Sequence, residues 1–358
     1  MDRSYYINLA REGVSMPIGT HLTLHEYPDP NAVLHNGAML GKVMEETARR
    51  YGTPIAVPVM DLTIEKEAML KKLGVAAGDI PTFHFSSPPE ADAAAALLDD
   101  AMLAVPRFKA LLDALTYVSS KTDLLPVGMC IGPFSLTTKL LADPIIPIFL
   151  AGDGMTAADS DEVKLIERVA LLARTIIERS IALQCKAGAK AVFLCEPAAN
   201  LVFFSPNQMH GKDDVFQRYV IEPNMKLRAI LESYGADLFF HDCGELTTAM
   251  VERFAQLDPA VLSLGSPVKL WDMEPFVPKQ TVLFGNLPSK KFFSDKEITV
   301  DQVRALADEL SMKMSATGHP FILASECDVL SVPGCDEVIH SKIEAFCGCG
   351  MHAAHKTA

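Results

Sequence analysis

Basic residues, cysteines and long apolar runs are scarce in this sequence. It contains 32 lysine and arginine residues against 45 aspartate and glutamate residues, which gives a formal net charge of −13. Binding to the phosphates of nucleic acid needs a basic surface. The charge therefore argues against nucleic acid as a main partner. It does not exclude a small anionic ligand held in a local basic pocket.

The apolar segments are too short, or too interrupted by charges, to cross a membrane. No stretch of about 18 apolar residues is free of charged side chains, and the first residues, Met1 to Tyr6, lack the apolar core of a signal peptide. Eight cysteines in 358 residues are too few for a disulfide scaffold. These absences predict a cytoplasmic protein whose thiols are reduced, buried or bound to metal.

Short apolar runs alternate with longer amphipathic segments along most of the chain. Eight runs are predicted as strands: Ile18 to Leu24, Pro54 to Met60, Leu125 to Ile131, Ala189 to Cys195, Ala236 to Phe240, Val261 to Leu264, Thr281 to Phe284 and Phe321 to Leu323. The segments between them have apolar residues at spacings of three and four, which favours helices. The alternation predicts an α/β fold, a single (β/α)8 TIM barrel.

The expected barrel comprises residues 1–358 as one domain, because no linker rich in Gly, Ser or Pro divides the chain. The segment from Ser86 to Leu98 is rich in Pro and Ala, and we interpret it as part of an insertion between strands 2 and 3. Active sites of such barrels lie at the carboxyl ends of the strands. The residues that follow the expected strands are therefore the candidates for a site.

A histidine and two cysteines occur at these strand ends. His241 and Cys243 follow the run Ala236 to Phe240, and Cys327 follows the run Pro320 to Ala324. Side chains two residues apart on a strand point to the same side. Catalytic zinc typically has three protein ligands and one open position. The pattern predicts a zinc site formed by His241, Cys243 and Cys327.

Several segments resemble the uroporphyrinogen decarboxylase-like superfamily over nearly the whole chain. They are Pro58 to Ala68, Gly132 to Leu136 and Lys186 to Ala189. The pattern His-x-Cys followed far downstream by Cys is similar to the zinc motif of its cobalamin-dependent branch, which includes methylcobamide:coenzyme M methyltransferase. The resemblance implies methyl transfer between a corrinoid, such as methylcobalamin carried by a partner protein, and a small thiol or methylated substrate.

Two other functions stay open at this point. The first is decarboxylation of a porphyrinogen without metal. Decarboxylases of the superfamily hold the substrate carboxylates with an Arg-rich segment near the N-terminus, whereas the corresponding region, Ser15 to Pro30, contains no Arg or Lys. The second is a barrel that binds a corrinoid protein or senses methyl groups and whose zinc is only structural. The identity of the methyl donor or acceptor and the formation of a homodimer are not determined by the sequence.

Three further polar residues lie at predicted strand ends. Glu196 and Asp61 are predicted to be catalytic. Glu196 could act as a fourth metal ligand or as a partner of His241, or it could cap a helix or form a salt bridge. Asp61 matches the acidic position that the decarboxylases place against pyrrole nitrogens, and could line a substrate pocket or cap the strand. Asn286 is predicted to contact the cofactor. Near the C-terminus, Cys347, Cys349 and His352 form a less favoured candidate for a second metal site.

Overall fold

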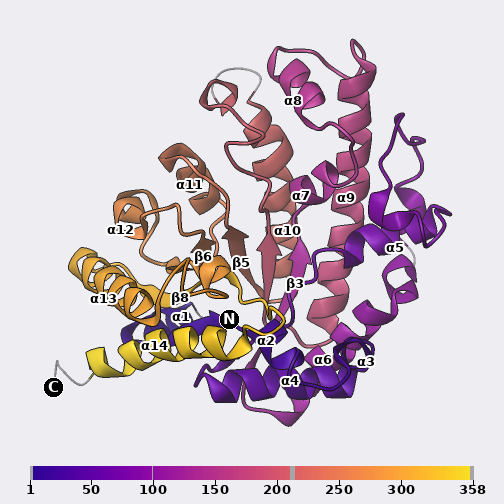
Figure 1. The fold of residues 1–358 in the computed structure, drawn as a ribbon. Helices are drawn as coiled ribbons and strands as arrows, with labels where there is room; N and C mark the ends of the chain where they lie inside the picture. Colours follow the sequence, from indigo (N-terminus) through magenta and orange to yellow (C-terminus); the bar gives the residue numbers. More distant parts are fainter. Residues whose placement is uncertain (1–2, 99, 210–213, 355–358) are drawn as a thin grey trace.

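The computed structural model describes residues 3–98, 100–209 and 214–354. Eight parallel strands form one curled sheet in the order β1-β8-β7-β6-β5-β4-β3-β2 (Figure 1). The strands are β1 (Ser15–Ile18), β2 (Ile55–Ala56), β3 (Leu125–Ile131), β4 (Ala191–Cys195), β5 (Asp237–Asp242), β6 (Val261–Leu264), β7 (Val282–Leu287) and β8 (Phe321–Asp328). The prediction of an α/β fold with eight parallel strands is confirmed.

Helices occupy the connections between these strands (Figure 1). The α-helices are α1 (Ser4–Arg11), α2 (Thr20–Leu24), α3 (Pro30–Leu34), α4 (Gly37–Arg50), α5 (Ile64–Lys72), α6 (Pro106–Lys121), α7 (Pro133–Thr138), α8 (Ile145–Gly152), α9 (Asp161–Lys186), α10 (Glu222–Ser233), α11 (Thr248–Ala255), α12 (Leu270–Met273), α13 (Val300–Thr317) and α14 (Asp336–Ala354). Short 3-10 segments are η1 (Ile80–Thr82), η2 (Ala95–Leu97), η3 (Asp100–Ala104), η4 (Pro206–Met209), η6 (Glu274–Phe276) and η7 (Ser289–Lys291), and a π-helical turn, η5 (Gln217–Ile221), precedes α10. In the described part of the chain, no helix is both long and apolar enough to span a bilayer.

The first predicted strand is mostly wrong. The expected strand from Ile18 to Leu24 begins where β1 ends, and residues 20–24 form the short helix α2. Nearly every side chain of this segment is buried, and a continuously buried apolar run has no period that separates a strand from a helix. β2 is also shorter than expected, with two residues, since it lies between Pro54 and Pro58, neither of which has a backbone N–H to donate.

The connection from β2 to β3 is long and contains α5, three 3-10 segments and α6. The predicted insertion falls within this connection, and the segment from Ser86 to Leu98 contains only the 3-10 turn η2. That this connection is an insertion, and that residues 1–358 form one domain, stay predictions.

Two clusters of buried apolar side chains lie on the two faces of the sheet. The larger one fills the space between the sheet and the surrounding helices. The smaller one lies inside the curled sheet and includes side chains from all eight strands. Inside it, the ring centroid of Phe193 lies 5.0 Å from that of Phe239 and 6.0 Å from that of Phe284. Phe239 lies two residues before His241 on the same strand, so this aromatic layer lies on the same face of β5 as the predicted ligand.

The pairing of β1 with β8 is irregular near the carboxyl end of β8. Met16 pairs with Ala324 and Ile18 pairs with Asp328. Pro17 therefore lies opposite three residues of β8, residues 325–327. Such an irregularity bends a strand and redirects its side chains, and bulges are common next to active sites. Cys327 lies within this irregular segment, so simple alternation along β8 does not determine its direction.

Truncating the aromatic layer should destabilise the fold. Phe193→Ala should lower the free energy of unfolding by about 3–5 kcal/mol, because a fully buried ring is replaced by a cavity. Phe293→Ala is the matched control, because Phe293 is 41% exposed, and it should change the stability by about 0.5 kcal/mol or less. Urea denaturation of both variants measures the difference. Equal losses would contradict the assignment of Phe193 to the interior layer.

Candidate metal centre

The structure brings His241, Cys243 and Cys327 together at the carboxyl ends of β5 and β8. Their ligand atoms all lie within 4.8 Å of one another. His241 is 1% exposed, and the two cysteines are partly buried. The side chains predicted from the sequence therefore do form one cluster.

A serine on the neighbouring strand orients the imidazole of His241. Ser263 lies opposite His241 in the register of β5 and β6, and its Oγ lies 2.9 Å from His241 Nδ1. In the described part of the chain, His241 Nε2 is buried and has no hydrogen-bond partner. A buried polar atom without a partner costs free energy. A metal ion at Nε2 would satisfy this nitrogen, with Nδ1–H donating to Ser263.

The two thiols are electrostatically coupled. A hydrogen bond from Cys327 lowers the pKa of the Cys243 thiol well below its usual range, with His241 and Lys290 acting in the same direction against burial. The same contact, together with burial, raises the pKa of Cys327. Cys327 Sγ also lies 3.9 Å from Met60 Sδ. One thiol is thus already inclined to the thiolate form, which is the form that binds metals.

Lys290 supplies positive charge beside the thiols. It lies in η7, directly after β7. Burial alone would lower the pKa of its ammonium group, but the nearby Cys243, Glu326 and Cys327 raise it. A cation at this position offsets the negative charge of two thiolates, or holds an anionic group of a bound molecule.

The donor set fits a zinc ion. Zinc is held by imidazole nitrogen at about 2.0–2.1 Å and by thiolate sulfur at about 2.3 Å, in tetrahedral geometry. In such a geometry, pairs of ligand atoms are roughly 3.5–4 Å apart, and the three atoms here need only a small approach from their limit of 4.8 Å. Three protein donors leave a fourth position for a substrate. His241, Cys243 and Cys327 would hold the ion.

The carboxylate of Glu196 contacts the backbone at the start of α7. Glu196 is fully buried, and its carboxylate accepts hydrogen bonds from Phe134 N (3.1 Å), Ser135 N (2.8 Å) and Asn224 Nδ2 (2.9 Å). Burial raises its pKa, although these bonds lower it. The partner of His241 Nδ1 is Ser263, and the roles of Glu196 as a metal ligand or as a partner of His241 stay predictions. The contacts favour a helix cap, and a catalytic role stays a prediction.

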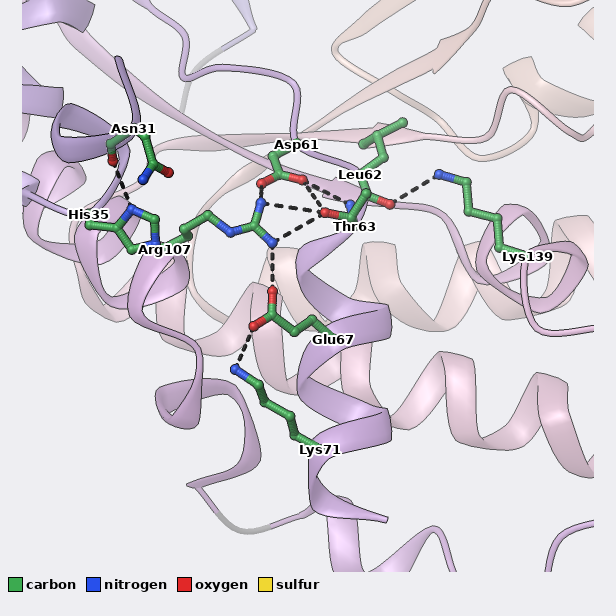
Figure 2. Close-up of polar contacts among 9 residues, drawn as sticks. All are labelled: Asn31, His35, Asp61, Leu62, Thr63, Glu67, Lys71, Arg107 and Lys139. Atoms are coloured by element: carbon green, nitrogen blue, oxygen red, sulfur yellow. Dashed lines mark hydrogen bonds and ion pairs between the residues drawn. The ribbon is translucent and has the colours of Figure 1, made fainter. Parts of the chain in front are cut away.

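Asp61 is held in a network of hydrogen bonds and ion pairs, which Figure 2 shows. Its Oδ1 accepts hydrogen bonds from Thr63 N at 3.1 Å and from Thr63 Oγ1 at 2.6 Å. Its Oδ2 pairs with Arg107. Arg107 in turn pairs with Glu67 at 2.6 Å. Because β2 ends at Ala56 and α5 begins at Ile64, these contacts hold Asp61 near the start of α5, and the catalytic role predicted for Asp61 stays untested.

Asn286 and the remaining cysteines have structural surroundings. The Asn286 amide nitrogen donates to Gly265 O at 2.8 Å and Val268 O at 2.7 Å, and the predicted contact of this residue with a cofactor stays a prediction. Cys130 and Cys195 are buried, in agreement with their interpretation as core thiols. The side chains of Cys349 and His352 lie outside the described residues, so the second metal site is not tested.

Sequence reasoning missed Ser263 and Lys290. Ser263 is the one polar residue in the apolar run from Val261 to Leu264, and that isolated hydroxyl was an available signal. Its pairing with His241 depends on the register between strands, which the sequence does not show. Lys290 lies four residues after the strand-end Asn286, and only the fold of η7 brings it to the thiols.

Comparisons with known proteins agree with this architecture. The family model described as Uroporphyrinogen decarboxylase (URO-D) matches residues 24–338. A methyltransferase from Methanosarcina mazei has a similar structure, with a TM-score of 0.66, 16% sequence identity, and coverage of 93% of this chain and 91% of that chain. At this identity the likeness shows the fold.

A 3-keto-D-glucoside 4-epimerase, YcjR, from E. coli has a TM-score of 0.37 at 11% identity, over 84% of this chain and 99% of that chain. That score is too low to support an argument. A search of curated proteins found no match.

Removing the Ser263 hydroxyl should weaken metal binding. Ser263→Ala should lower the zinc affinity about 10–100-fold, because the imidazole loses the contact that fixes its orientation. Competition with a chromophoric chelator measures the affinity. Ser266→Ala is the control, because Ser266 is exposed in the loop after the same strand. An unchanged affinity in Ser263→Ala would contradict the role of this serine.

Proposed function

The chain belongs to the uroporphyrinogen decarboxylase family, and from this premise we propose that it is a zinc-dependent methyltransferase. It would move a methyl group between a corrinoid on a partner protein and a small thiol or methylated substrate. The observation that carries the proposal is the cluster of His241, Cys243 and Cys327, with a buried and unpartnered His241 Nε2 in the described structure. Family membership alone does not choose between decarboxylation and methyl transfer.

A zinc ion at this cluster would lower the pKa of a thiol substrate or polarise a methylated heteroatom. The chain's own residues would prepare the position. Ser263 fixes the imidazole plane of His241. The Lys290 ammonium group offsets the charge of the two thiolates. The aromatic layer below, including Phe239, closes the interior of the sheet on that side.

A corrinoid on the partner protein would supply the methyl group to a thiol acceptor. The sulfur–carbon bond would form as the bond between the methyl group and the corrinoid breaks, with the electron pair of that bond left on the corrinoid. The proton of the thiol is released to solvent. The protein contributes by holding acceptor, methyl carbon and cobalt in line.

The corrinoid is proposed to arrive on a separate protein, because the chain has no Asp-x-His-x-x-Gly signature for binding cobalamin. A docking partner needs access to the carboxyl ends of the strands. α8 lies at this end of the molecule (Figure 1) and exposes Ile145 (52%), Ile146 (52%) and Phe149 (61%). Large exposed apolar side chains in one short helix are typical of contact surfaces, and this position supports docking of a partner at the carboxyl ends of the strands.

The decarboxylase alternative is less well supported. A porphyrinogen carries many carboxylates, whereas the segment from Ser15 to Pro30 contains no Arg or Lys. The carboxylate of Asp61 matches the position that decarboxylases use against pyrrole nitrogens. In this structure it forms an ion pair with Arg107 and accepts a hydrogen bond from Thr63. As part of the same proposal, the curled sheet, which has β1 and β2 at its two edges, is of the (β/α)8 barrel class, and residues 57–124 contain its insertion between strands 2 and 3.

Metal analysis and a transfer assay test this function together. The purified protein should contain about one zinc per chain and should transfer methyl groups between methylcobalamin and a thiol, which corrinoid absorbance follows. Cys243→Ala should lose most of the zinc and the transfer activity, because it removes one of the ligand atoms in the cluster.

The control for this experiment is Cys335→Ala, because Cys335 is a partly buried cysteine that lies outside the cluster and contacts Pro333 O. This variant should retain zinc and activity. Full zinc occupancy in Cys243→Ala would refute the ligand assignment. Zinc-free protein that transfers methyl groups as fast as the intact protein would instead show that the zinc is structural.

A further inference from the structure

A cavity that is separate from the thiol cluster lies beside α5. Its volume is about 640 Å³, and its lining includes Lys66, Lys71, Arg107 and Lys139. Small-molecule sites have volumes of roughly 300–1,000 Å³. Four cationic side chains around one cavity are unexpected in a chain with a net charge of −13.

Two of these cations are already neutralised by carboxylates. Figure 2 shows Arg107 between Asp61 and Glu67, and Lys71 on the other oxygen of Glu67. The Lys71–Glu67 distance is 2.5 Å. These ion pairs fix the positions of the two cations and leave little of their charge for a ligand.

The other two cations have no carboxylate partner among the described residues. Lys66 Nζ donates to Pro81 O at 3.2 Å and to Lys139 O at 3.0 Å. Lys139 Nζ donates to Leu62 O at 3.2 Å. An ammonium group has three N–H donors, so both side chains keep donors for another molecule. Lys66 is 8% exposed, and such deep burial of a cation without a paired anion is costly.

The pKa values of Lys66 and Lys139 are both lowered, as expected for two ammonium groups with no bound anion. Burial lowers the pKa of Lys66, and the positive charge of Lys139 lowers it further. Partial desolvation of the ammonium group lowers the pKa of Lys139, although the charges of Asp61 and Glu65 raise it. A bound anion would compensate both effects.

We propose that this cavity binds a small phosphate monoester through Lys66 and Lys139. Two unpaired ammonium groups match a dianion. Lysine binds phosphate as a point charge, whereas planar carboxylates are matched best by the fork of an arginine. The one arginine of the cavity, Arg107, is already used by Asp61 and Glu67. The apolar part of the lining, Ala77, Ile80 and Pro81, fits an organic body attached to the phosphate.

A short segment of the chain, Met60 to Thr63, connects the cavity with the thiol cluster. Met60 contacts Cys327 at its sulfur, and the next residue, Asp61, pairs with Arg107 of the cavity wall. Occupation of the cavity could therefore influence the cluster through the segment Met60 to Thr63. The binding proposal itself does not depend on the proposed methyl transfer.

Calorimetric titration at constant ionic strength tests the proposal, with phenyl phosphate as the probe above pH 7. Benzenesulfonate has the same body with a single charge, and phthalate is a dicarboxylate dianion. Phenyl phosphate should saturate one site and bind at least about tenfold more tightly than either, because only it presents a compact dianion. Tighter binding of phthalate, or no saturation by phenyl phosphate at about 10 mM, would overturn the phosphate assignment.

Variants identify the site. Lys139→Gln and Lys66→Met should each weaken phenyl phosphate binding about tenfold or more, because each removes a charged donor. Lys109→Gln is the control, because Lys109 is exposed on α6 near Arg107 but does not line the cavity. Because Lys66 is buried, the melting temperature of each variant is measured without ligand. Lys139→Gln, at an exposed position, decides if Lys66→Met does not fold. Equal binding by wild type and Lys139→Gln would refute the site.

Discussion

The pairing of His241 on β5 with Ser263 on β6 is the contact on which the candidate site depends. The strand register places the two residues side by side, and the serine hydroxyl holds one ring nitrogen. The other nitrogen is then fixed in a buried position beside two thiols. Without a bound ion, this buried nitrogen has no hydrogen-bond partner, which lowers the free energy of unfolding; a bound ion would remove that loss. The aromatic layer below His241 makes the arrangement rigid.

Charge is distributed unevenly around this centre. The chain is acidic overall, but Lys290 lies at the thiols and four cations line the cavity beside α5. The two groups of cations differ in their partners. Lys290 balances thiolates, whereas Lys66 and Lys139 have only backbone carbonyls as hydrogen-bond partners among the described residues. An acidic surface with local positive pockets is suited to small anions and not to nucleic acid.

The sequence predicted the parts of the structure that follow from local periodicity. Alternation along a strand was sufficient to place His241 and Cys243 on one side, and the position of Cys327 after a second apolar run supplied the third ligand. It could not show that Cys327 lies in an irregular segment opposite Pro17, because that depends on the pairing of the first and last strands. The first strand was misplaced because a continuously buried run has no period.

The roles predicted for isolated polar residues depended most on contacts that the sequence does not contain. Glu196 follows a strand, as a ligand would, yet its oxygens are used by the start of α7 and by Asn224. Asp61 also follows a strand and is held by Arg107, which is 46 positions away in the chain. Position at a strand end therefore indicates the neighbourhood of a site, and the tertiary partners determine which side chains remain available for chemistry.

X-ray absorption at the zinc edge tests the central claim most directly. The account predicts a first shell of one nitrogen from His241, two sulfurs from Cys243 and Cys327, and one lighter exchangeable atom. Addition of a thiol substrate should replace the lighter atom by a third sulfur. A shell without sulfur, or a shell with two sulfurs that no thiol, methylated substrate or corrinoid alters, would contradict a zinc centre with an open position for methyl transfer.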